Sequence, residues 1–564
     1  ATDRFQILTC DFSGKDQKFL TQEQALERIE SIRTSQRARG IKEVFARIQS
    51  QLTKALDSKR SAYMFSDLQQ STHAFENEMD EPDTTIVWHF IPELAGGSPN
   101  IWVDSIWFDE PMRIASRPAA LRIRLSHNSS AAVNGIPMNL SINGDRVAIG
   151  TFNLVPGLDT DTVLRFNHGD AGIKEGVVSI EDAPIRFDDD WNFGFEVTDN
   201  IQVTILSEQS SSETAKSIQR VFGTANGLYN AEIHSRWTPE LIAKSKLIIL
   251  CDWDAQGSGF ALEIADFVRK GGSIVFLPKN GQIADNELFD SLGLPSSGAW
   301  VETDDRVRTL QLNHPFFQNM FAEFPERIDL PNAKRIWNRT VASSEEILAR
   351  TELGRPFLSR CQLDRGQAFI FHVSAEAESS NLTRHALWIP LLLRMAERAY
   401  ATPINAGEIG SLKRWTLAAD VPNIGELKLT QSSSPSKTPS ETNESAGDWL
   451  PEVRQVPGQI QVLLEGLSIN PGHYVLRDQS QSWASIGLNQ DRRESNHAAF
   501  SLAEYKSFIE KNGWNHVKVL SVTASSLPQV IELSEQGVPL WKAFIIFALI
   551  ALAIETILLR TWKA

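Results

Sequence analysis

The sequence predicts a multidomain protein of mixed class: two doubly wound α/β units separated by an antiparallel β-sandwich, a small C-terminal β domain and one transmembrane helix. Strands alternate with helices in residues 1–105 and 201–400, which is typical of α/β units. Short strands with period-two patterning fill residues 106–200, as expected of a sandwich. Residues 540–559 form one continuous apolar run. A length of 564 residues also suits about four domains of ordinary size.

The composition is that of a folded, acidic protein. Fifty-five basic residues against 70 acidic ones give a net charge of −15, and 42% of the residues are hydrophobic. Because nucleic-acid binding needs a basic surface, we expect no nucleic-acid partner. The three cysteines (Cys10, Cys251 and Cys361) lie far apart, so they predict neither a disulfide framework nor a cysteine metal site.

The first hundred residues predict a parallel α/β unit. Residues 4–10 have the apolar pattern of a strand, and Thr21 opens a Thr-x-x-Gln capping box at the start of a helix. Residues 41–56 carry an apolar stripe at helical spacing. Residues 62–67 and 85–91 are short apolar strands. This alternation favours a sheet of parallel strands.

The next region predicts an antiparallel sandwich. Residues 121–125 and 138–142 alternate between apolar and polar side chains. Asn143-Gly144 is a strong type I′ hairpin signal. Further short strands bounded by turn residues bring the expected number to about seven.

From residue 201 the helix–strand alternation resumes and predicts the second α/β unit. Residues 201–206, 246–251, 271–277 and 368–372 are its expected strands, separated by amphipathic segments.

Residues 401–536 predict a small β-rich domain. Residues 459–464 and 473–476 have strand patterns. The Ser-, Pro- and Thr-rich stretch 431–448 is too polar to build a core, so we interpret it as a linker.

The apolar run predicts a membrane-spanning helix over residues 538–561. As a helix, its 20 central residues would be about 30 Å long, which matches the hydrocarbon thickness of a bilayer. Trp541 and Trp562 lie at its two ends, where indole rings favour the interface. Glu555 is the polar exception, and it can reach the interface or pair with a neighbouring helix. A buried core helix is the alternative interpretation.

Basic residues around the span predict its orientation. Arg560 and Lys563 lie at its C-terminal end, whereas Lys542 alone lies at its N-terminal end. By the positive-inside rule, the short C-terminus is expected in the cytoplasm and the bulk of the chain outside.

Two candidate metal motifs lie in the first unit. Ser66 and Asp67 end a predicted strand, where α/β sheets bind ligands, so Asp67 is a weak candidate metal ligand that we weigh against a structural turn. Asp11-x-Ser13 resembles the start of an Asp-x-Ser-x-Ser metal loop, but Lys15 replaces the second serine. A solvated turn is therefore the preferred interpretation of that motif.

The remaining candidates favour no chemistry. Cys251, Asp252 and Asp254 follow a predicted strand, but no histidine is placed by local spacing to activate the thiol, so a buried core cysteine is preferred. Residues 188–190 are three acids that could bind Ca²⁺, although such turns are usually only solvated. We predict no catalytic and no cofactor-binding residues.

Several segments, in this order, resemble the BatA-like family of bacterial aerotolerance-operon membrane proteins: residues 5–19, 63–69, 187–193, 380–397 and the final span. The resemblance implies a von Willebrand factor A-like domain in residues 1–105 that lacks its first strand. It implies a glutamine-amidotransferase-like domain in residues 201–400, inactive because residues 278–281 hold no Cys or Ser where active enzymes carry the nucleophile.

The same resemblance implies a function and a location. Asp67 would match the family's later metal-loop aspartate, so Mg²⁺ is expected only in a complete A-like domain, and no other cofactor is expected. The chain starts at Ala1 without a signal-peptide pattern, so we expect the natural protein to begin upstream. We expect a non-enzymatic scaffold of the bacterial inner membrane, mostly periplasmic, with other A-like membrane proteins and a MoxR-type ATPase as partners. The alternative is an envelope hydrolase or amidotransferase acting through residues 201–400.

Overall fold

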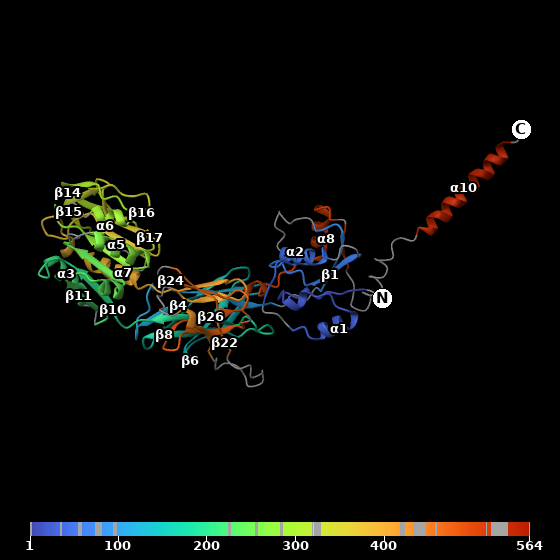
Figure 1. Ribbon diagram of the computed structural model, residues 1–564, viewed down its shortest axis with the longest axis horizontal. Coiled ribbons are helices and arrows are strands. Elements are labelled where there is room, and N and C mark those ends of the chain that lie inside the picture. Colours follow the sequence, from blue (N-terminus) through green and yellow to red (C-terminus); the bar gives the residue numbers. More distant parts are fainter. Residues whose placement is uncertain are drawn as a thin grey trace. The chain divides into compact units, whose positions relative to one another are not determined.

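The computed structural model describes residues 3–33, 37–54, 59–73, 82–93, 99–223, 227–253, 258–281, 286–318, 320, 329–417, 424–432, 447–456, 459–467, 469–514, 516–520 and 540–562. The chain divides into two compact units (Figure 1). The first contains Ala1–Ser98 and Asn496–Ala564, and the second contains Pro99–Ser495. The second unit is therefore inserted into the sequence of the first.

The first unit is built on a three-stranded parallel sheet in the order β1-β2-β27. Its strands are β1 (Arg60–Ser66), β2 (Ile86–Pro92) and β27 (Val517–Val519). Trp88 and Phe90 alternate onto one face of β2, where the Trp88 ring lies 4.7 Å from that of Phe45 between centroids. Helices α2 (Ile41–Leu52) and α8 (Leu502–Lys511) both contribute to this single cluster.

The structure corrects two expectations for this unit. Residues 4–10 do not form a strand. Their one β-type pairing is an isolated bridge between Phe5 and Leu20, and within the described residues the segment joins no strand of the sheet. Residues 502–519 fall within the expected domain of residues 401–536, but their helix α8 and strand β27 complete the first unit instead. The capping box is confirmed, since Thr21 and Gln24 exchange both hydrogen bonds at the start of α1 (Gln22–Glu30).

The second unit begins with a sandwich of two antiparallel sheets, in the orders β3-β4-β7 and β6-β5-β8-β9. The strands are β3 (Ile101–Phe108), β4 (Pro118–His127), β5 (Val133–Ile142), β6 (Asp145–Leu154), β7 (Thr160–Asn167), β8 (Gly172–Ile180) and β9 (Asp190–Val197). Alternate residues of β4 and β5, such as Leu121, Ile123 and Leu140, fill the shared core. Since β3 belongs here, the predicted boundary at residue 105 lies inside a strand. Asn143 and Gly144 both have positive φ, as the hairpin signal requires.

The sandwich encloses one histidine, which makes its stability sensitive to acid. His168 is 5% exposed, and its ring lies 5.3 Å from that of Phe166 between centroids. Burial, reinforced by the charge of Arg113, lowers the pKa of His168 to about 4. The unfolded chain binds this proton near pH 6.5, so the stabilisation is complete above that pH and is lost as the pH falls towards about 4.

Replacing His168 by phenylalanine is expected to remove about 2 kcal/mol of acid destabilisation between about pH 7 and pH 4.5. The measurement is the change in thermal unfolding midpoint between these two pH values for the native chain and for H168F. Equal pH dependence of the two proteins would contradict the prediction.

A nine-stranded sheet follows, in the order β11-β10-β12-β13-β18-β17-β16-β14-β15. Its bounds are β10 (Ile201–Leu206), β11 (Tyr229–His234), β12 (Leu247–Cys251), β13 (Ser273–Leu277), β14 (Gly298–Leu310), β15 (Asn332–Arg339), β16 (Glu345–Thr351), β17 (Pro356–Leu363) and β18 (Gly366–Phe371). The first five strands of this order are parallel, and the remaining pairs are antiparallel.

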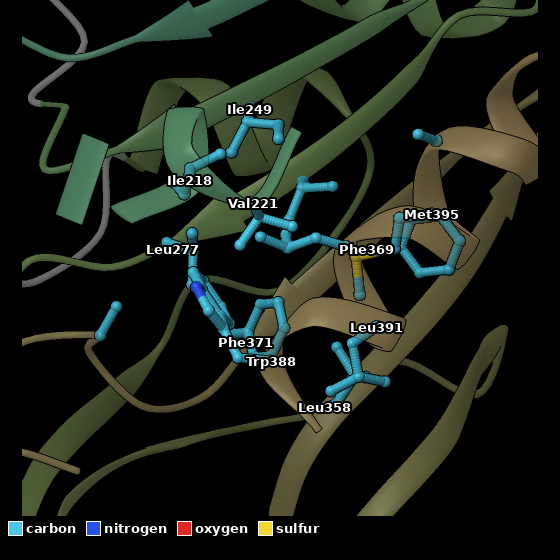
Figure 2. Packing of buried hydrophobic residues seen from close by; sticks show 14 of the residues in the cluster. Ile218, Val221, Ile249, Leu277, Leu358, Phe369, Phe371, Trp388, Leu391 and Met395 are labelled. Carbon is cyan, nitrogen blue, oxygen red and sulfur yellow. The ribbon is translucent and has the colours of Figure 1, made fainter. Parts of the chain in front are cut away.

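Two hydrophobic clusters cover this sheet. One includes residues of α3 (Glu213–Gly223) and α7 (Trp388–Ala399), and Figure 2 shows Trp388, Leu391 and Met395 of α7 in the same cluster as Phe369 and Phe371. The other includes residues of the helices α4 (Pro239–Lys244), α5 (Ser258–Arg269) and α6 (Asn286–Ser291). Neighbouring residues of β12 belong to different clusters, Ile249 to the first and Ile248 to the second. The parallel half is thus an α/β layer, and the chain as a whole is mixed α/β with mostly sheet.

The second unit ends in a β module of two sheets, in the orders β19-β26-β25-β21-β22 and β20-β24-β23. The strands are β19 (Ala406–Glu408), β20 (Arg414–Leu417), β21 (Lys428–Gln431), β22 (Asp448–Trp449), β23 (Val453–Val456), β24 (Gln459–Leu463), β25 (Gly472–Arg477) and β26 (Ser482–Asn489). The expected linker 431–448 begins at the last residue of β21 and ends in β22, and these two strands pair with Thr430 opposite Asp448; residues 433–446 lie outside the described residues.

This β module packs directly on the sandwich. Gly194 of β9 and Asn405 exchange two backbone hydrogen bonds of 2.8 Å. The side-chain amide of Asn489 donates to the backbone oxygen of Asn192 at 3.0 Å. The two β regions therefore share an interface of backbone groups as well as side chains.

Among the described residues, one helix is long and apolar enough to cross a membrane. It is α10 (Trp541–Thr561), with 21 residues and a mean hydropathy of 2.4, and none of its apolar stretch is buried against the protein.

Candidate functional sites

The carboxyl edge of the parallel strands is the first candidate site. In open α/β sheets, ligands bind outside the carboxyl ends of the strands where the strand order reverses. Here the chain passes from β10 outward to β11 and then returns to β12 on the other side of β10. The reversal therefore places Leu206, Cys251 and the residues that follow them at the edge where such a fold binds ligands.

Asp252 follows β12 at this edge in a strained conformation. Its φ is +51°, in the left-handed region that residues other than glycine rarely adopt. Its Oδ2 accepts a hydrogen bond of 2.7 Å from the hydroxyl of Ser212. The Ser212 hydroxyl also accepts from the backbone amide of Ala215, so it caps the start of α3. The carboxylate is thus fixed beside a helix N-terminus.

A second carboxylate, Glu376, follows β18 at the same edge. Burial raises the pKa of Glu376, and the charge of Asp252 raises it further, while a backbone hydrogen bond from Asn280 opposes both effects. Arg335 donates to Oδ1 of Asn280 at 3.0 Å, which fixes that loop. Two carboxylates at one sheet edge, the Glu376 one with a raised pKa, can exchange a proton with a bound group or bind hydroxyl groups.

Sequence reasoning missed Glu376. The sequence feature that could have identified it is its position just beyond the predicted strand 368–372, at the edge where α/β sheets bind ligands. Asp254, the other candidate near Asp252, lies outside the described residues.

Cys251 has the properties of a core residue. It is fully buried, and burial, together with the charge of Asp252, raises the pKa of its thiol far above the ordinary value. Within the described ranges, no histidine is hydrogen-bonded to its sulfur. The thiolate that a nucleophile requires is therefore disfavoured.

Alkylation of the native full-length chain tests this assignment. We expect N-ethylmaleimide to modify the exposed Cys10 and to leave the buried Cys251 and Cys361 unmodified until the protein is denatured. Peptide mass spectrometry measures the three sites separately. Modification of native Cys251 as fast as Cys10 would revive the cysteine-enzyme hypothesis.

Ser66 and Asp67 fix the turn after β1. The Ser66 hydroxyl lies 3.2 Å from Nε2 of His73 and accepts from the backbone amide of Leu68. Oδ1 of Asp67 accepts a long hydrogen bond of 3.4 Å from Gln69. Across the part of the chain that the structure describes, no three His, Cys, Asp or Glu side chains are grouped to hold a metal ion. Metal binding by Asp67 stays a prediction.

The loop with Asp11 and Ser13 is organised by the buried Asp16. Although burial works to raise it, hydrogen bonds from Arg28, Ser13 and Thr9 hold the pKa of Asp16 below its usual value. The Ser13 hydroxyl donates to Oδ1 of Asp16 at 3.0 Å. A cavity of about 540 Å³ is lined by Asp11, Ser13, Gly14, Lys18 and Arg28.

The acids 188–190 differ from the expected solvated turn. Asp188 is fully buried, and its Oδ2 accepts a hydrogen bond of 2.7 Å from the side-chain amide of Asn100, which offsets part of the cost of burying it. Asp190 alone of the three is exposed.

The membrane candidates all belong to α10 or adjoin it. Trp541 is 58% exposed and Trp562 is 84% exposed, at opposite ends of the helix. Glu555 lies within the helix and Arg560 in its last turn. Lys563 lies outside the described residues.

No family model matches the chain, and no curated protein matches it. A cytoplasmic protein from Salmonella typhimurium is 12% identical, with a TM-score of 0.27, over 35% of this chain and 98% of its own. A ThuA-like protein from Parabacteroides merdae is 14% identical, with a TM-score of 0.28, over 36% of this chain and 90% of its own. The CARDB domain of a Pyrococcus furiosus protein is 13% identical, with a TM-score of 0.16, over 19% and 97%. Similarities this low identify neither a family nor an activity.

Proposed function

We propose that this chain is a membrane-anchored protein that binds other membrane proteins, with its folded units outside the cytoplasm. The observation that carries the proposal is α10, whose apolar side chains are all exposed along 21 residues. In water this surface would be strongly unfavourable, whereas a helix of about 31 Å fits the hydrocarbon core of a bilayer.

The charges around α10 support one orientation. Arg560 and Lys563 follow the apolar stretch, and Lys542 alone precedes its centre. The positive-inside rule then places the C-terminus in the cytoplasm of a bacterium and both units in the periplasm.

Glu555 supports binding to other membrane proteins. A carboxyl group between apolar residues such as Ile554 and Ile557 is costly in lipid unless another helix offers a hydrogen-bonding or charged partner. The partners that the family resemblance implies are other A-like membrane proteins and a MoxR-type ATPase. The sandwich and the β module would offer periplasmic surface to these partners.

Removing residues 540–562 is expected to release the chain from the membrane almost completely. The measurement is the distribution of the protein between membrane and soluble fractions of the native host after an alkaline wash. As a control, a leucine–alanine helix of the same length should restore membrane binding. A truncated chain that stays in the membrane would contradict the anchoring role.

Glu555→Leu separates anchoring from partner binding. This variant should remain in the membrane and lose the membrane proteins that co-purify with the native chain. Unchanged co-purification would exclude Glu555 as a binding residue, and the absence of any partner for the native chain would overturn the proposed function.

The carboxylates at the sheet edge favour a second candidate, an envelope hydrolase. Asp252 and Glu376 would supply its acid–base pair, because both carboxylates lie at this edge and Glu376 has a raised pKa. The double variant Asp252→Asn and Glu376→Gln should abolish any hydrolysis of envelope polysaccharide or peptide and leave partner binding intact. Hydrolysis that survives it would exclude this candidate.

A further inference from the structure

Three fully buried polar residues meet at one end of the sandwich, from distant parts of the second unit. Asn100 precedes β3, Asp188 precedes β9 and Ser495 ends the unit. The side-chain nitrogen of Asn100 donates to Oδ2 of Asp188 at 2.7 Å and to the backbone oxygen of Ser495 at 2.9 Å. These two bonds hold the three residues in direct contact.

Each of these residues has a buried oxygen without a hydrogen-bond partner. The unpartnered atoms are Oδ1 of Asn100, Oδ1 of Asp188 and Oγ of Ser495, and Oδ1 of the neighbouring Asp189 shares this property. A buried acceptor left unpaired costs about 1–3 kcal/mol, and a charged one costs more. Four such oxygen atoms in adjoining residues indicate a bound ion or group that oxygen atoms coordinate.

The charge around these oxygens favours a cation. The carboxylate of Asp182 adjoins the same turn and accepts from the backbone amide of Ile101 at 2.7 Å. Arg492 is the nearby positive group: its Nη2 donates to the backbone oxygen of Asp190 and its guanidinium lies over the Trp191 ring, while its Nε and Nη1 are also buried without a hydrogen-bond partner. Among the described residues, Arg492 forms no ion pair with a carboxylate. The aspartates therefore outnumber the cation available to them.

We propose that Asn100, Asp188, Asp189 and Ser495 bind a calcium ion through their unpartnered oxygens. Carboxylate, amide and hydroxyl oxygens suit a hard cation, and Ca²⁺ accepts irregular sets of six to eight such ligands where Mg²⁺ demands an octahedron. Only two of the four side chains, Asp188 and Asp189, carry a carboxylate.

The position of the ion gives it a structural role. The chain passes into the second unit at Pro99 and leaves it at Ser495, so an ion held by Asn100 and Ser495 fastens both crossing points to the sandwich. Calcium modules outside cells bind at about 0.1–1 mM, which is the range expected for a site with two carboxylates.

Calcium titration of the full chain in detergent, after chelator treatment, tests the proposal. We expect calorimetry to detect one site, and we expect CaCl₂ to raise the unfolding midpoint of the second unit more than MgCl₂ at equal ionic strength. Hydrogen exchange should slow in residues 99–103, 186–191 and 491–495. If buried water fills the cluster instead of an ion, no calcium should bind even at a calcium concentration about ten times the expected dissociation constant. That result overturns the proposal.

Variants identify the ligands. Asp188→Asn is expected to weaken calcium binding by more than about tenfold. Because Asp188 is fully buried and its replacement could prevent folding, the half-buried Asp189→Asn is the second variant, with the same expected loss. The matched control is Asp190→Asn, an exposed neighbour that should bind calcium like the native chain. If Asp188→Asn, Asp189→Asn and Asp190→Asn all bind calcium with the same affinity, the assignment of the ligands is overturned.

Discussion

Replacing Gly487 by alanine is expected to destabilise the second unit by at least about 3 kcal/mol. A Cβ at this position would lie 2.0 Å from the backbone carbon of Asn192 and 2.1 Å from its oxygen. Neither atom can move without shifting β9, because Asn192 and Asn489 are hydrogen-bonded across the same interface. The cost therefore arises from backbone displacement, which rotamer changes cannot relieve.

Thermal unfolding of the full chain measures this loss, and hydrogen exchange locates it. We expect faster exchange in β9 and β26, at the interface between the sandwich and the β module. Gly425→Ala is the control, since a Cβ there would meet nothing within 4 Å. If Gly487→Ala and Gly425→Ala unfold at the same temperature, that result contradicts the close contact between Gly487 and the backbone of Asn192.

Replacing Glu345 by alanine is expected to cost about 3–5 kcal/mol, because it leaves the buried charge of Arg339 without its partner. Both side chains are 0% exposed. Glu345 also accepts from the Ser359 hydroxyl at 3.0 Å and from the backbone amide of Ala342 at 2.9 Å. Arg339 is enclosed by aromatic rings and cannot turn to solvent without disturbing them.

Its neighbour provides a matched control. Glu346 pairs with Arg360 at 2.8 Å, but its side chain is 52% exposed, so Glu346→Ala should cost no more than about 1 kcal/mol. The double variant Arg339→Met and Glu345→Leu should recover much of the loss, since it removes the unpaired charge. Similar costs for E345A and E346A would contradict the buried pair.

Local signals in the sequence predict the local structure well. The Thr21 capping box, the Asn143-Gly144 hairpin and the alternation of Leu121, Ile123 and Leu125 each depend on neighbours a few residues away. The apolar stretch of α10 is equally local, since length and composition alone define it.

What the sequence does not predict depends on distant partners. The strand β27 pairs with β2, and no periodicity in either segment specifies the other. Residues 4–10 have the composition of a strand but find no neighbouring edge beyond Leu20. Burial of Asp188 follows from Asn100, and the raised pKa of Glu376 from Asp252, so both became visible only when the fold brought these residues together.

The insertion of one unit into the other also fixes the order in which a nascent chain can fold. The sheet of the first unit needs β27, which begins at Val517, whereas β2 ends at Pro92. Joining these strands through an unfolded loop of several hundred residues would carry a large entropic cost. Once the inserted unit has folded, the bond between Asn100 and Ser495 holds its two ends together, and that loop becomes a short connection. Folding of the inserted unit thus brings the two sequence segments of the first unit close enough to pair.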